Sequence, residues 1–199
     1  MKSVLSEELA ALSILRDRYR KTVCLPRYTP FRWWECDVCE VTRAGFLREY
    51  EIKISRADFF ADAAKEHREF LSYRQTMEEF NLSGVMPAAK REKLNKHDLL
   101  AKGDPRGPVQ FWYVTPVGLI QPSELPAFAG LIELIDRGPT WRLSHRWVET
   151  EKVKAPRLHG EKLRASVASH MISVCYYRFH SEVMRRYDNK LAAAELKAS

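Results

Sequence analysis

The chain has 199 residues, of which 45% are hydrophobic and 30% charged, a composition typical of one soluble globular domain with an appendage or of two small domains. It contains no apolar run of the roughly 20 residues that a membrane-spanning helix needs, and its start does not resemble an export signal. We therefore expect a cytoplasmic protein that does not enter a membrane.

The formal net charge of +7 is unevenly distributed. Residues 1–150 hold 23 basic and 21 acidic side chains, whereas residues 151–199 hold 10 and 5. Basic density is highest between Arg137 and Arg164, where Trp141 and Trp147 lie among the basic residues. This pattern is typical of a surface beside a phosphate backbone, although a solvated basic surface explains any single residue equally well.

The first 30 residues predict a helix and then a loop. Ser6 suits an N-cap, two glutamates follow it, and the leucines at positions 5, 9, 12 and 15 repeat at three to four residues, which indicates a helix over residues 6–20. Pro26 and Pro30 then indicate a loop.

A β-hairpin is expected next, from residues 32–42 and 46–54. If Ala44 is the centre of a three-residue turn, paired positions sum to 88, so that Asp37 lies opposite Glu51 and Glu35 lies opposite Lys53. Alternation puts these four side chains on one face. The other face is then apolar and carries Trp34, Cys36, Val38, Tyr50, Ile52 and Ile54.

The rest of the chain predicts helices and strands in turn. Ser55 and Asp58 form a variant capping box that should start a helix reaching about residue 73. A proline and five basic residues indicate a polar helix over 87–102, and the glycines and prolines of 103–108 end it. Strands are expected at 109–115, 130–135 and 140–148, and a long helix at 161–196, with a break near 188–189.

The opposition of Asp37 and Glu51 is the strongest chemical signal in the hairpin. A solvated sheet face with cross-strand ion pairs predicts opposite charges facing each other, as Glu35 and Lys53 would, but like charges directly opposite cost stability. A bound Mg²⁺ or Mn²⁺ would remove the conflict, because hard cations are held by one or two carboxylates with water and substrate phosphate. Lys53 could then reach a phosphate oxygen.

Two cysteines have the spacing of a zinc or redox motif, Cys36 and Cys39. In a strand, an offset of three points the two sulfurs to opposite faces, and no second pair of ligands accompanies them. We expect plain buried thiols, since free cysteine is commonly buried.

Around these residues the chain resembles the PD-(D/E)XK nuclease superfamily, whose signature is an acidic residue on one strand and Glu-x-Lys on the next. The string YEIKISRADF, followed by Asp62 and Lys65, is similar to the MmcB-like DNA-repair branch, as are FWYVTP, GLI and LPAFAGLI downstream. The similarity covers roughly residues 30–135. Cys36 stands where the signature has proline.

The resemblance implies an α/β (α+β) fold with a restriction-endonuclease-like core, a mixed four- to five-stranded sheet flanked by helices. We expect this domain over residues 1–150 and a basic helical extension over 151–199, packed on or beside it. The implied catalytic residues are Asp37, Glu51 and Lys53. The implied metal ligands are Asp37, Glu51 and the Ile52 carbonyl, with Glu8 as an additional acid.

The expected function is metal-dependent hydrolysis of phosphodiester bonds, in DNA repair or phage DNA processing. DNA, single-stranded or branched forms included, is the expected partner, and a homodimer is left open. Candidate DNA contacts are Lys93, Lys96, His97, Arg142 and Arg146. Asp58, Asp62 and Lys65 share one helical face, so they could line the site, with Asp58 and Lys65 as possible additional site residues, or form surface pairs, which we favour. The alternatives are a catalytically silent DNA-binding protein and a protein-interaction or inhibitor module.

Overall fold

A computed structural model of the chain describes residues 5–18, 22–30, 32–63, 68–71, 91–138 and 147–198. The chain divides into two compact units, Met1–Lys162 and Leu163–Ser199. The expected division at residue 150 falls inside a strand of the first unit. The elements are α1 Glu7–Arg18, β1 Val23–Tyr28, β2 Cys36–Val41, β3 Leu47–Ile52, α2 Arg56–Ala63, β4 Arg68–Leu71, β5 Arg91–Leu94, α4 Lys96–Lys102, β6 Gln110–Pro116, the short 3-10 helix η1 Pro122–Glu124, β7 Ala129–Asp136, β8 Trp147–Val153 and α5 Ala165–Ala198.

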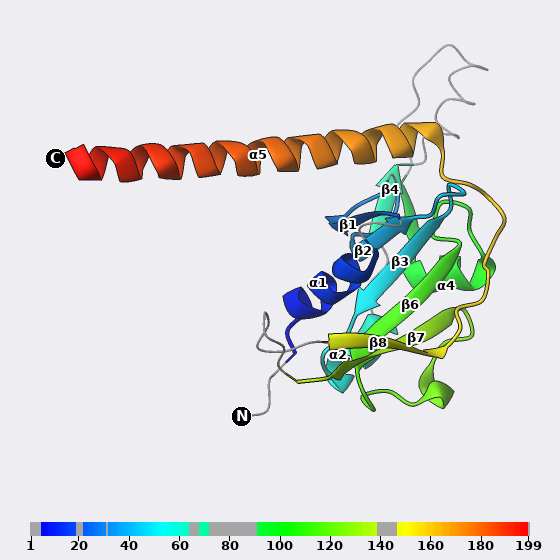
Figure 1. Cartoon of the computed structure of the whole chain (residues 1–199). Coiled ribbons are helices and arrows are strands. Elements are labelled where there is room, and N and C mark those ends of the chain that lie inside the picture. Colours follow the sequence, from blue (N-terminus) through cyan, green and yellow to red (C-terminus); the bar gives the residue numbers. More distant parts are fainter. Residues whose placement is uncertain are drawn as a thin grey trace, which may run out of the picture. The chain divides into compact units, whose positions relative to one another are not determined.

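The first unit is built on a mixed six-stranded sheet in the order β1-β2-β3-β6-β7-β8 (Figure 1). Strands β1, β2 and β3 are antiparallel, β3, β6 and β7 are parallel, and β8 is antiparallel to β7. The expected mixed sheet is therefore present, with six strands rather than four or five. Strand β1 replaces the loop expected around Pro26. This position lies on an edge strand, where the missing N–H of proline is tolerated.

The β2–β3 hairpin has the predicted register. The pairs Val38–Tyr50 and Val41–Leu47 both sum to 88, and continuing the same register sets Asp37 opposite Glu51. The backbone N–H of Ile52 donates to Asp37 Oδ2 at 2.7 Å, which ties the carboxylate to the neighbouring strand. Strand β2 begins at Cys36, and the predicted strand positions before it are turn or irregular.

Helix α1 covers one face of the sheet, and the predicted leucine stripe contributes only in part, since Leu5 and Leu15 pack in or against the core and Leu9 and Leu12 do not. Leu9 and Leu12 are 42% and 59% exposed, whereas Ala10 and Ile14 are fully buried. Ser13 Oγ donates to the carbonyl of Trp147 at 3.2 Å, so the helix approaches the sheet through small residues. The core on this face comprises Leu5, Ala10, Ile14, Val38, Tyr50, Ile52, Trp112, Val114, Ile132, Leu134 and Ala155.

Helices α2 and α4 cover the opposite face, and both are shorter than predicted. The helix expected over 55–73 ends at Ala63 among the described residues, and 68–71 form strand β4. The helix expected over 87–102 is strand β5 followed by α4. Strands β4 and β5 pair with each other in a separate two-stranded sheet, so long-range pairing overrides local helical preference here.

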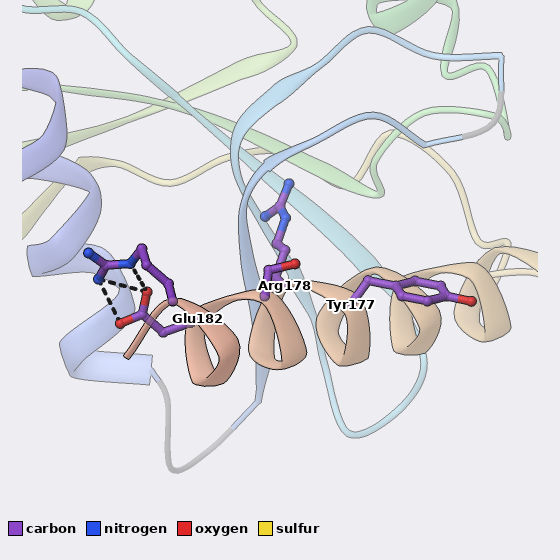
Figure 2. A pocket seen from close by; sticks show the side chains of 5 residues that line it. Tyr177, Arg178 and Glu182 are labelled. Atoms are coloured by element: carbon purple, nitrogen blue, oxygen red, sulfur yellow. Dashed lines mark hydrogen bonds and ion pairs between the residues drawn. The ribbon is translucent and has the colours of Figure 1, made fainter. Parts of the chain in front are cut away.

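The chain ends in the 34-residue helix α5, which is continuous through Asp188 and Asn189, where a break was expected. Residues of this helix line a pocket, among them Tyr177, Arg178 and Glu182, whose side chains Figure 2 shows. Of the predicted strand at 140–148, residues 140–146 lie outside the described residues. No helix among the described residues is long and apolar enough to cross a membrane.

Candidate active site

Three charged side chains of the β3 region are buried on one face of the sheet. Glu49, Glu51 and Lys53 are only 0%, 4% and 3% exposed. Their spacing of two residues directs all three to the face covered by α2 and α4. Burial of ionised groups requires partners of opposite charge, and the helices of this face supply them.

Lys96, the first residue of α4, supplies one partner. Its Nζ lies 2.6 Å from Glu49 Oε1 and 2.8 Å from Glu51 Oε2, while Trp33 Nε1 donates to Glu49 Oε2 at 2.9 Å. Although burial by itself lowers the pKa of Lys96, the charges of Glu49 and Glu51 raise it well above its usual value. Lys96 was expected to contact DNA on the surface. It lies instead inside the protein, bonded to carboxylates.

Lys53 is held by carboxylates from β3 and α2. Its Nζ lies 3.0 Å from Glu51 Oε1 and 3.0 Å from Asp62 Oδ1, and 3.7 Å from Asp58 Oδ1. Burial lowers the pKa of Lys53, but the charges of Glu51 and Asp62 outweigh this and raise it above its usual value. Lys53 is therefore a fixed ammonium group. Its expected partner Glu35 is exposed and precedes β2.

Asp62 lies inside the site, which corrects the expectation of a surface pair. Its side chain is 0% exposed, Tyr113 donates its hydroxyl to Asp62 Oδ2 at 3.0 Å, and His97 Nε2 lies 2.9 Å from the same oxygen. His97, also expected at a DNA surface, is half-buried in this cluster. The sequence did not single out Glu49 or Tyr113 as site residues, and a surface role was favoured for Asp62. The period of two linking Glu49 to Glu51 and Lys53 was the available signal.

Asp37 is the acid of the set that solvent can reach, because it is only half-buried. Burial and then the charge of Glu51 raise the pKa of Asp37 to about 6, although the N–H of Ile52 opposes the change. The like-charge conflict inferred from the sequence is thus present in the three-dimensional arrangement. A cation near Asp37 would offset this repulsion.

The chemistry of the donor set fits a hard divalent cation. Carboxylate and backbone carbonyl oxygens are its preferred ligands, and Glu51 retains acceptor capacity beside its two lysines because each carboxylate oxygen has two lone pairs. The described residues contain no group of three or more His, Cys, Asp or Glu placed to hold a metal, so water and substrate would complete the shell of any ion. Four carboxylates face two ammonium groups here, namely Asp37, Glu49, Glu51 and Asp62 against Lys53 and Lys96.

The other residues predicted to form the site or to contact DNA are not part of this cluster. Glu8 is exposed and pairs with Arg27 at 3.8 Å, on the helix that covers the opposite face of the sheet. Lys93 is exposed on β5. Lys65, Arg142 and Arg146 lie outside the described residues.

Cys36 and Cys39 are buried and form no disulfide, as expected for plain thiols. Burial raises the pKa of the Cys36 thiol well above its usual value, and the charge of Glu49 adds to this effect. The Cys36 thiol is therefore not set up as a thiolate ligand or nucleophile.

Comparison with known proteins assigns no family to the chain. No family model matches the sequence, and no curated protein matches it. Among solved structures, the chain is similar to the SPO1766 protein of unknown function from Silicibacter pomeroyi, with 16% identity, a TM-score of 0.46 and coverage of 88% of this chain and 87% of that one. The function of that protein is unknown, so the similarity assigns no activity here.

Proposed function

We propose that the first unit is a metal-dependent nuclease-like domain that hydrolyses phosphodiester bonds in DNA, in repair or phage DNA processing. The proposal depends above all on the like-charge opposition of Asp37 and Glu51, which follows from the hairpin register; burial and then the charge of Glu51 raise the pKa of Asp37. A sheet face with no ion to bind would gain by placing opposite charges there. Lys53, bonded to Glu51, adds a fixed positive charge beside this pair.

In this proposal each residue of the site has a separate role. Asp37, Glu51 and the Ile52 carbonyl would hold Mg²⁺ or Mn²⁺. When bound, the ion would polarise the scissile phosphate and activate a water molecule. Lys53 would donate to a phosphate oxygen on which negative charge develops, as its raised pKa keeps it protonated. Basic residues outside the site would hold the DNA backbone.

One observation favours a second candidate, a nuclease-fold protein that binds DNA without cleaving it. Both oxygens of Glu51 already accept from lysines, Lys53 and Lys96. Glu51 would then stabilise the fold and attract a metal ion only weakly. In that case Asp37 alone would be too weak a ligand set for catalysis.

Cleavage assays separate the two candidates. The protein is incubated with single-stranded, duplex and branched DNA in Mg²⁺ or Mn²⁺, beside Asp37→Ala and Lys53→Ala. The enzyme predicts cleavage that falls at least a hundredfold in both variants and stays unchanged in Glu35→Gln, an exposed acid just before β2. Salt-sensitive DNA binding without cleavage would support the silent protein, and no binding at low salt would overturn both.

Metal binding has its own test. Mg²⁺ should raise the melting temperature of the wild-type protein, and Asp37→Asn should abolish this increase because it removes one ligand charge. An unchanged increase in Asp37→Asn would place the ion elsewhere. The same titration of Glu35→Gln controls for general screening of negative charge.

A further inference from the structure

The ammonium group of Lys96 is placed as a metal ion would be placed between two carboxylates. It lies 2.6 Å from Glu49 Oε1 and 2.8 Å from Glu51 Oε2, and Lys96 is 5% exposed. Trp33 Nε1 donates to the other oxygen of Glu49, so that both oxygens of this buried carboxylate have partners. The bridging position is therefore filled by a cation that belongs to the chain.

The position of Lys96 is determined by local structure. Asn95 caps α4 by accepting from the backbone N–H groups of His97 and Asp98, at 2.9 and 3.2 Å, which fixes the first turn of the helix. Lys96 Nζ also lies 5.3 Å from the ring centre of Phe111, over the sheet. The lysine is held from the backbone at one end and by two carboxylates at the other.

Lys96 also changes how much charge an incoming ion must balance. Without it, Glu51 would keep its contact with Lys53, but Glu49 would lose its contact with an ammonium group, and a second cation would be needed between the two buried carboxylates. With it, Glu49 and Glu51 each contact an ammonium group, while the half-buried Asp37 is bonded to the backbone N–H of Ile52. One divalent ion, placed at Asp37, is then enough for the site.

We propose that the buried ammonium group of Lys96 takes the place of a second divalent cation, so that the site binds a single metal ion, at Asp37 and Glu51. This inference rests on the proposed metal-dependent function. Lys96 is then a positioning residue that fixes Glu49 and Glu51 and sets the number of metal ions at one.

The number of Mn²⁺ ions bound per chain tests this directly, by isothermal titration calorimetry and by electron paramagnetic resonance of free Mn²⁺. The wild-type protein should bind one equivalent, and two equivalents would overturn the proposal. Lys96→Ala removes the cation and leaves room, and it should bind two. Lys96→Met removes the charge but fills the space, and it should bind one. Lys102→Ala, an exposed lysine of the same helix, is the matched control and should also bind one.

The variants also separate this inference from the proposed function. One equivalent in both the wild-type protein and Lys96→Ala would refute the role of Lys96 and leave the Asp37 site standing. No binding by the wild-type protein together with one equivalent in Lys96→Ala would refute the Asp37 site but show that Lys96 fills a cation position.

If Lys96→Ala does not fold without metal, the double variant Lys96→Ala/Glu49→Gln removes one carboxylate as well. It should fold and bind one equivalent, and two would overturn the proposal.

Discussion

Single residues in the site show how burial changes the role of a charge. Lys53 and Lys96 are nearly inaccessible, and each stays an ammonium group only because two carboxylates lie within hydrogen-bond distance. A buried charge whose partner is removed costs several kcal/mol, whereas an exposed ion pair contributes little. Variants of this network therefore test stability as well as activity, and both need to be measured.

Asp37 should make the stability of the protein depend on pH. Its pKa rises from 3.8 to about 6 on folding, so the folded state binds a proton more tightly than the unfolded state. Stability should therefore rise as the pH falls from about 7 to 4, and the cost of ionised Asp37 is fully present above about pH 7. Asp37→Asn should stabilise the protein at pH 8, by about 3 kcal/mol at most, and flatten this dependence, as measured by urea denaturation.

The control for this prediction is Glu35→Gln, which removes an exposed acid close in sequence and should leave the pH profile unchanged. Saturating Mg²⁺ should reduce the difference between wild-type and Asp37→Asn protein at pH 8, if the ion binds Asp37. A pH profile of Asp37→Asn identical to that of the wild-type protein would show that ionised Asp37 does not destabilise the folded state.

At the scale of elements, α4 is a short helix that depends on its two ends. Asn95 caps its start, and Gly103 ends it in the left-handed conformation with φ of 67°. Its seven residues are too few to be stable alone. Correct placement of Lys96 and His97 therefore depends on the cap and on packing against the sheet.

Removing the cap should weaken both the helix and the network. Asn95→Ala should lower the free energy of unfolding by about 1 kcal/mol, because two backbone N–H groups lose their acceptor. Asn95→Asp keeps an acceptor at the same position and should lose much less. Chemical denaturation measures both effects, and equal losses in the two variants would contradict a capping role.

At the scale of the whole molecule, the core and the site lie in one compact unit. The six-stranded sheet, its α1 core and the charged network all fall within Met1–Lys162. Helix α5 forms the second unit, and several of its large apolar side chains are exposed, with Ile172 and Phe179 at 70% each.

A chain ending at Lys162 should therefore fold without α5. We expect one cooperative thermal transition and an unchanged near-ultraviolet circular dichroism spectrum from the buried aromatic residues, since Trp33, Tyr50 and Trp112 all belong to the first unit. Mn²⁺ stoichiometry should equal that of the full chain. A broad transition with exposed apolar surface would show that the sheet needs residues beyond 162.

Features that depend on neighbouring residues were predictable from the sequence. The turn centred on Ala44 and the alternation of side chains gave the hairpin register, and with it the opposition of Asp37 and Glu51. The N-cap of α1 at Ser6, the apolar strands β6 and β7 and the glycine that ends α4 follow from equally local rules. Each is set by backbone geometry over a few residues.

Features that depend on distant residues were not predictable from the sequence. Strands β4 and β5 form where helix was expected, because each provides the hydrogen-bond partner of the other. Glu49, Asp62 and Lys96 look like surface residues in sequence, and only the packing of α2 and α4 on the sheet buries them and pairs their charges. A local pattern fixes which face a side chain occupies, but what covers that face depends on segments remote in the chain, and this decides whether a charge meets water, a metal ion or another charge.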